Sequence, residues 1–473
     1  MRIKQLDLFR AAAILLVIVY HYGPPMPRLP LGAERVLAPV FHRGWMGVDL
    51  FFVISGFLIA GLLFTEFKSR GEIDVKRFFV RRGLKIYPAF YVLLFSTVVI
   101  GWTLGRPFSR AGFLCELVFF QNYGPGLWVH TWSLGVEEQF YLTLPFALCL
   151  LASLTGGLPR LYRRRYLLIA LISIAIALPA LVVSRLGLAQ EKVLFSLAAG
   201  AVAFWLLAAW GILASYLTRR SAQEPRARNP FRLLPHSFAF VALLCLALRA
   251  LTAFELTPWE SKSHSFPSHL HMDSLMFGVL LSYFHHFEGE RLKRFIERRR
   301  RTMGVVLLLL GASLFAFEIE KSLFFQVFGF TLLYVLFGGL LLLSLYTRAE
   351  GAQPKRTLSF VARIGLYSYS IYLWHVPLVT WVFEPLIRPN PGPLEYFAGL
   401  AAYTVSSVVV GILMAKLIEQ PVLHFRDRFF PSNTKRPPID MRPAEASAEG
   451  SGGGDEASAP AVLLQQPASS SRL

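Results

Sequence analysis

Two side chains in the first apolar segment could carry out proton transfer or bind an anion. Arg10 and His21 lie eleven positions apart, which on an α-helix is three turns plus about 20° and roughly 16 Å along the axis. They therefore share one face, and Asp7 is placed to pair with Arg10. A histidine can take a proton from a hydroxyl group, although one at a helix end often has only a structural role. Because ionisable groups in apolar segments usually have a task, the face that His21 shares with Arg10 favours a functional role for it.

A second group of candidates is cationic. Arg81, Arg82 and Lys85 precede an apolar segment, and Lys85 is one helical turn from both arginines, so the three can share a surface. Such a surface can bind a polyphosphate, with arginine in bidentate geometry. The alternative is a basic flank that only sets membrane topology, which the spacing alone favours.

Carboxylates follow in the segment HTWSLGVEEQFYL, which begins at His130. Glu137 and Glu138 are adjacent, so on a helix they point about 100° apart and only one can face His21. A carboxylate beside a histidine orients the imidazole and raises its basicity. The alternative is an acid placed near a helix N-terminus by the helix dipole.

The segment SHLHMDSLMFG contains His269, His271 and Asp273. On a helix, His269 and Asp273 would share a face. The spacing of the two histidines suits metal binding on one face poorly, and no third strong ligand is evident. The three cysteines, which form no spaced motif, are Cys115, Cys149 and Cys245. We therefore expect no bound metal.

Long apolar segments must position these residues. The chain is 55% apolar and 16% charged, against roughly 25% charged in soluble domains, and apolar runs of about 18 residues indicate membrane spans. We expect an all-α bundle of ten to twelve transmembrane helices. The candidate spans are 6–23, 46–65, 88–105, 139–156, 166–184, 193–215, 237–254, 269–286, 303–320, 323–346, 365–386 and 396–417.

The net charge of +19 follows this topology. With the N-terminus in the cytoplasm, about three quarters of the lysines and arginines fall in cytoplasmic segments, as the positive-inside rule expects. The distribution argues against nucleic acid as a partner and indicates a multi-pass protein of the cell membrane with both termini in the cytoplasm. We predict a membrane domain over 1–430 and a disordered cytoplasmic tail over 431–473, rich in Ser, Gly, Ala, Pro and Glu.

Five segments together resemble the acyltransferase-3 family of bacterial membrane acyltransferases, which O-acetylate glycans and other acceptors. The segments, in the family's order, are LDLFRAAAILLVIVYHY, GVDLFFVISGFLI, RRGLKIYP, WSLGVEEQFYL and SIYLWHVPL, the last containing His375. The resemblance implies that His21 is the catalytic base and that Arg10 is essential. It also implies that the cluster of Arg81 and Arg82 binds acyl-coenzyme A. The catalytic carboxylate of the WSLxVE motif is then Glu137 rather than Glu138, expected to orient His21 and stabilise its imidazolium.

Two positions depart from the family's pattern. The last cation of its RRxxR motif is Lys85, which keeps the charge but loses bidentate geometry. Its His-x-Arg-x-Asp pattern has His271 in place of arginine, which leaves the role of that segment open.

The resemblance implies transfer of an acyl group, expected to be acetyl, from cytoplasmic acyl-coenzyme A to a hydroxyl of a glycan or glycolipid outside the membrane. No tightly bound cofactor is expected, since acyl-coenzyme A is a substrate. Composition alone suits a polytopic transporter or flippase of a lipid-linked sugar equally well, but the candidate residues lie at span ends on both faces, which favours a donor inside and an acceptor outside.

Overall fold

The computed structural model describes residues 4–105, 108–154, 229–256, 258–316, 321–346, 356–386, 388 and 390–432. All regular structure in these ranges is helical, which confirms the predicted class there. The longer helices are α1 (Lys4–Tyr20), α3 (Met46–Arg70), α4 (Val75–Thr103), α6 (Trp132–Leu154), α9 (Leu234–Glu255), α11 (Met272–Phe287), α12 (Gly289–Ala316), α13 (Leu323–Tyr346) and α16 (Pro393–Met414). The shorter ones are α2 (Glu34–His42), α5 (Arg110–Leu117), α10 (Ser261–His264), α14 (Arg356–Leu366), α15 (Ser368–Leu378) and α17 (Gln420–Phe429).

Six helical segments of the described chain are long and apolar enough to cross a membrane. They are Met46–Arg70, Val75–Thr103, Val129–Ser153, Leu234–Glu255, Leu323–Tyr346 and Pro393–Phe429. Each overlaps a predicted span. The predicted spans 166–184 and 193–215 lie outside the described residues, as does the tail beyond residue 432. The full number of spans therefore stays a prediction.

Helices α1 and α3 pack closely in opposite directions. A methyl group added at Gly44 would lie 2.1 Å from the carbonyl oxygen of Leu16, and one added at Gly47 would lie 2.4 Å from that of Ala13. The later residue, Gly47, thus meets the earlier residue of α1, so the two helices run antiparallel. The end of α1, where His21 follows, therefore lies beside the start of α3.

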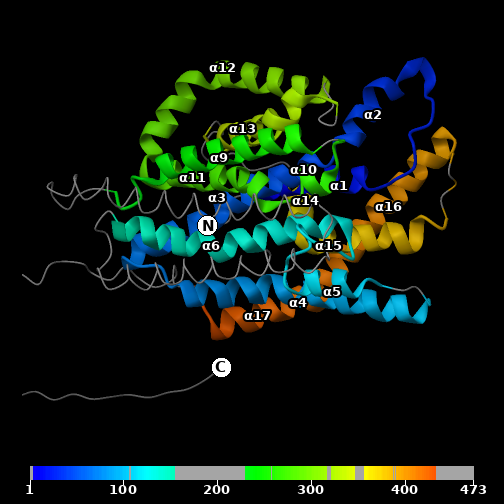
Figure 1. Cartoon of the computed structure of the whole chain (residues 1–473), viewed down its shortest axis with the longest axis horizontal. Helices are drawn as coiled ribbons and strands as arrows, with labels where there is room; N and C mark the ends of the chain where they lie inside the picture. Colours follow the sequence, from blue (N-terminus) through cyan, green and yellow to red (C-terminus); the bar gives the residue numbers. More distant parts are fainter. Residues whose placement is uncertain are drawn as a thin grey trace, which may run out of the picture. The chain divides into compact units, whose positions relative to one another are not determined.

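Helices α3 and α11 touch through their backbones. A methyl group at Gly56 would lie 2.0 Å from the Leu275 carbonyl oxygen, and one at Gly278 would lie 2.2 Å from that of Val53. Only glycine permits this approach at both positions. The crossing places the first turns of α11 against residues 53–56 of α3, and Figure 1 shows the two helices close together.

The last helix of the described chain, α17, packs against α4. Figure 1 shows α17 beside α4, and a 3.1 Å ion pair between Arg81 and Asp427 joins them. At the other end of the chain, a methyl group at Gly365 of α14 would lie 1.8 Å from the Asp7 carbonyl oxygen of α1. These contacts gather α1, α3, α4, α14 and α17 around the candidate site.

Candidate functional site

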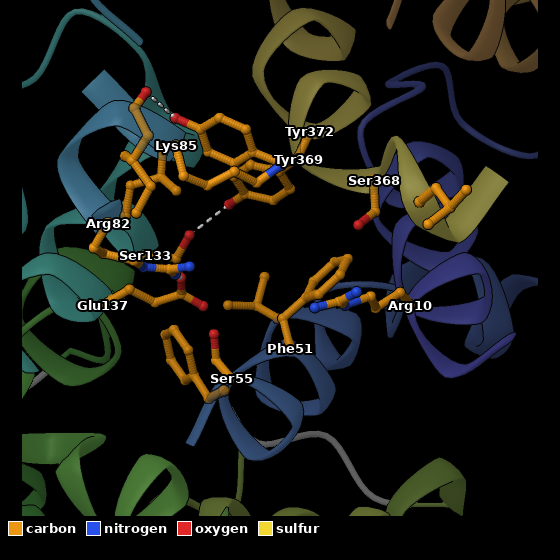
Figure 2. A pocket seen from close by; sticks show the side chains of 15 residues that line it. Arg10, Phe51, Ser55, Arg82, Lys85, Ser133, Glu137, Ser368, Tyr369 and Tyr372 are labelled. Atoms are coloured by element: carbon orange, nitrogen blue, oxygen red, sulfur yellow. Dashed lines mark hydrogen bonds and ion pairs between the residues drawn. The ribbon is translucent and has the colours of Figure 1, made fainter. Parts of the chain in front are cut away.

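A cavity of about 130 Å³ lies among α1, α3, α4, α6, α14 and α15. Its lining includes four residues that the sequence singles out, Arg10, Arg82, Lys85 and Glu137. Figure 2 shows Arg10 and Arg82 pointing into it from opposite sides. We call it the central cavity.

The cations of the central cavity differ in how firmly they are paired. Arg10 Nη1 lies 3.3 Å from Asp7 Oδ1, as the spacing predicts. Lys85 contacts the buried carboxylate of Glu419. Arg82 is held more loosely, because its Nη2 lies 4.0 Å from Glu137 Oε2 and its Nε has no hydrogen-bond partner among the described residues. Arg82 is therefore the cation best placed to accept an anionic ligand.

A second cavity, of about 140 Å³, adjoins the first. Arg82 and Lys85 line both cavities. The second cavity, which we call the cationic cavity, has five basic residues in its lining, namely Arg77, Arg81, Arg82, Lys85 and Arg426. The prediction that Arg81, Arg82 and Lys85 share a surface is confirmed.

The segment that follows α17 borders the cationic cavity. Arg81 contacts the Phe430 carbonyl oxygen as well as Asp427, and Arg77 Nε donates to the Pro431 carbonyl oxygen at 3.0 Å. These contacts fix two of the guanidinium groups at the edge of the cavity.

Three histidines from distant parts of the sequence meet near the end of α1. The ring centroid of His375 lies 5.0 Å from that of His21 and 5.1 Å from that of His130. His130 and His375 are buried. His21 Nδ1 lies 2.9 Å from the Val17 carbonyl oxygen and 3.3 Å from His375 Nε2. We call these residues the histidine cluster.

A buried carboxylate shapes the turn that carries His130. Glu116 Oε1 accepts hydrogen bonds of 2.9 Å from the backbone amides of Leu127 and Trp128 and from the Thr131 hydroxyl. His130 Nε2 lies 3.2 Å from the Leu373 carbonyl oxygen. Glu116 thus accepts hydrogen bonds from backbone amides that would otherwise be buried without a partner. These bonds fix the turn and with it the position of His130.

Tyr372 connects the histidine cluster to the central cavity. Its hydroxyl donates to the His130 carbonyl oxygen at 2.6 Å and lies 2.7 Å from the Ser133 hydroxyl. Tyr372 and Ser133 both line the cavity (Figure 2). The cavity and the cluster therefore share one wall.

Helix α3 orders the three parts of the site. Its start lies beside the end of α1, residues 48–55 border the central cavity, and residues 59–66 border the cationic cavity. At 1.5 Å per residue, residues 47 to 66 span about 28 Å, close to the roughly 30 Å thickness of a bilayer core. The histidine cluster and the cationic cavity thus lie toward opposite ends of α3.

Glu137 does not occupy the place expected of it beside His21. The hydrogen bonds of the His21 ring are with Val17 and His375. Glu137 Oε2 accepts a 2.7 Å hydrogen bond from Tyr141 and faces Arg82 instead. Glu137 points from α6 toward α3 and α4, not toward the end of α1. The geometry therefore corrects the pairing, and it links Glu137 to the cavity cation instead.

The third motif is also arranged differently from the expectation of one helical face. Helix α11 begins only at Met272, and His269 lies in the preceding 3-10 turn, where its Nδ1 is 3.1 Å from the Tyr123 hydroxyl. Asp273 pairs instead with Arg249 of α9, and both are buried. His271 Nδ1 lies 3.6 Å from Asp49 Oδ1. Within the described ranges, no group of three or more His, Cys, Asp or Glu side chains could hold a metal ion.

Several residues of the site escape reasoning from sequence. His375 lies in a segment that carries the family resemblance, and His130 lies two residues before another, but a single sequence does not show that they meet. Arg77 and Arg426 read as topological flanks. The one local signal was His375, an ionisable group inside an apolar segment.

Comparisons with known proteins agree with the resemblance. A family model described as an acyltransferase domain matches residues 3–282 and 231–416. Peptidoglycan O-acetyltransferase OatA of Listeria monocytogenes is 30% identical over 160 residues, which are 30% of this chain and 24% of the relative. O-acetyltransferase OatA of Staphylococcus aureus is 32% identical over 164 residues, 31% of this chain and 24% of the relative. The match thus spans about a quarter of the length of these relatives. No solved structure matches the chain significantly.

Proposed function

The chain belongs to the acyltransferase-3 family, and we propose that it is a membrane O-acyltransferase. It moves an acyl group from cytoplasmic acyl-coenzyme A to a hydroxyl of a glycan or glycolipid on the extracytoplasmic side. Acetyl is the group we propose, because the relatives are named O-acetyltransferases and one is named for peptidoglycan. The protein lies in the inner membrane with both termini in the cytoplasm, as the distribution of basic residues predicts.

The observation that carries the proposal is the pair of cavities that share Arg82 and Lys85. Coenzyme A carries a diphosphate and a ribose phosphate, and the five basic residues of the cationic cavity offer several bidentate contacts to such a polyanion. The long pantetheine arm then extends past Arg82 into the central cavity. Its thioester end reaches the wall formed by Ser133 and Tyr372, next to the histidine cluster.

His21 is the general base of the proposed reaction. Its Nδ1 faces the Val17 carbonyl oxygen at 2.9 Å. Because a carbonyl oxygen only accepts, the proton sits on Nδ1 and leaves the Nε2 lone pair for the acceptor hydroxyl. The hydroxyl oxygen attacks the thioester carbon while its proton passes to Nε2. The carbon–sulfur bond then breaks, and the leaving coenzyme A thiolate takes that proton.

In this mechanism, Arg10 and Glu137 help to bind and position the donor. Arg10 points into the central cavity opposite Arg82 (Figure 2) and positions the donor along its path. Glu137 keeps Arg82 at the junction of the two cavities through the 4.0 Å approach and the Tyr141 contact. Their effect is therefore expected on donor binding as well as on turnover.

Membranes that contain the full chain, incubated with radiolabelled acetyl-coenzyme A, test the proposal. We expect label to move to membrane or cell-surface glycan, and His21→Ala to abolish this transfer at unchanged expression, since general base catalysis contributes roughly 10²- to 10⁴-fold. Transfer by His21→Ala near the wild-type rate would refute the base assignment. If the same membranes take up a lipid-linked sugar but transfer no label, the alternative of a transporter or flippase would be supported instead.

A further inference from the structure

The two nitrogens of His375 have different partners. Nδ1 lies 2.7 Å from the Tyr372 carbonyl oxygen. Since this oxygen can only accept a hydrogen bond, Nδ1 carries the ring proton and donates it. Nε2 of the neutral ring therefore has a free lone pair. That nitrogen lies 3.3 Å from His21 Nδ1.

His21 presents the complementary group. Its Nδ1 carries a proton because Val17 offers a carbonyl oxygen 2.9 Å away, and the same N–H also approaches His375 Nε2. The N–H is thus shared between a backbone and a side-chain acceptor. The backbone acceptor is part of α1 itself, whereas His375 comes from α15 and ties the ring of His21 to the rest of the site.

The ring of His375 is held rigidly. Its side chain is fully buried, its backbone carbonyl accepts from the Tyr403 hydroxyl at 3.1 Å, and the His130 ring packs edge-on at 5.1 Å. A reacting group is held in place by a neighbouring side chain that is itself fixed by packing and hydrogen bonds.

We propose that His375 is a positioning residue for acyl transfer, which holds His21 in the tautomer and orientation in which Nε2 faces the acceptor hydroxyl. This inference rests on the proposed function. When His21 Nε2 takes the hydroxyl proton, the ring becomes positively charged and its Nδ1–H becomes a stronger donor. His375 Nε2 accepts this bond and stabilises the charged ring. It thereby fills the role that the sequence assigns to Glu137.

Three full-length variants test the inference in detergent, with radiolabelled acetyl-coenzyme A as donor and a chitin oligosaccharide as acceptor. His375→Leu removes the acceptor atom while keeping an apolar side chain in the site. His375→Gln keeps an oxygen that can accept from His21 Nδ1–H. His236→Leu makes the same change at an exposed histidine of α9, outside the site, and serves as the matched control.

We expect His375→Leu to lower kcat roughly 10- to 100-fold with KM for acetyl-coenzyme A within about two-fold of wild type. His375→Gln should recover most of the lost kcat, and His236→Leu should stay within about two-fold of wild type. Melting curves of the purified variants check that all are folded.

Two results would overturn the inference. One is a kcat of His375→Leu equal to that of wild type. The other is equal loss in the Leu and Gln variants, which would indicate a packing role. Failure of the proposed function has a different signature, because the wild-type protein would then transfer no label to glycan in membranes that contain its native acceptor.

Discussion

Buried carboxylates in this protein pair with cations that are close in sequence or far away in it. Arg10 and Asp7 are three positions apart, and their pairing follows from helix geometry. Lys85 and Glu419 pair across more than 300 positions, which spacing cannot predict. Each pair reduces the cost of an ionisable group in an apolar bundle, so pairing alone does not identify the groups that act on a substrate.

The pair of Arg249 and Asp273 illustrates a structural role. Their side chains are 1% and 0% exposed. We predict that Arg249→Met lowers the free energy of unfolding by about 3–5 kcal/mol, because it leaves a buried carboxylate without its cation. Unfolding of the purified protein by denaturant, followed by tryptophan fluorescence, measures the change.

The double variant Arg249→Met/Asp273→Leu is the control for that measurement. Removing both charges should restore much of the stability, since two apolar groups replace the pair. If the single variant were as stable as wild type, the pair would not hold α9 to α11.

Arg82 is the residue for which we predict a role in donor binding. Arg82→Gln should raise KM for acetyl-coenzyme A about ten-fold or more, because a charge-assisted bond to phosphate is lost. Arg82→Lys should have a KM between those of wild type and Arg82→Gln, since lysine keeps the charge but not the bidentate geometry. Steady-state kinetics at saturating acceptor give these values.

Arg291, on the first turn of α12, offers a matched control. It is exposed, and within the described part of the chain its ion pair is with Glu288, so Arg291→Gln should leave KM unchanged. Equal effects at Arg82 and Arg291 would mean that the donor responds to overall charge and not to the cavity.

At the scale of helices, apolar periodicity and length predict which segments are helical but not which helices touch. The glycines that permit backbone contact, Gly56 and Gly278, lie in two of the quoted motifs, but the sequence does not show that these motifs meet. The beginning of α11 was also predicted too early: residues 269–271 form a 3-10 turn and the step into α11, and only then does the regular helix start. This difference separates His269 from Asp273.

The crossing of α3 and α11 makes a quantitative prediction. Gly278→Ala places a methyl group 2.2 Å from the Val53 carbonyl oxygen, so the helices must separate, at a cost of about 1–3 kcal/mol in the free energy of unfolding. Gly304→Ala on α12 meets nothing within 4 Å and should be neutral or stabilising by up to about 1 kcal/mol.

Thermal melting of both variants in the same detergent compares them directly. A lower melting temperature for Gly278→Ala alone supports the close crossing. Equal melting temperatures would show that α3 and α11 have room for a side chain where they meet.

For the whole molecule, the sequence predicted the helical class, the family and the shared surface of Arg81, Arg82 and Lys85. It could not predict the meeting of His21 with His130 and His375, because that contact joins segments more than 100 positions apart. The expected contact of Glu137 with His21 is not found, because Glu137 faces Arg82. The sequence does not show in which direction a side chain on α6 points.

For the whole molecule we propose one passage along α3, with a cationic entrance at one end and an imidazole base at the other. Such a passage allows donor and acceptor to remain on opposite sides of a membrane. This sidedness distinguishes it from an enzyme whose two substrates enter from the same side.

Transfer across a sealed membrane tests this claim most directly. Radiolabelled acetyl-coenzyme A is enclosed in proteoliposomes of the full chain, an impermeant chitin oligosaccharide is added outside, and acetylation of the oligosaccharide is measured. We predict labelled oligosaccharide outside the vesicles with wild-type protein and none with His21→Ala. Acetylation that occurs only when donor and acceptor are on the same side would contradict the passage.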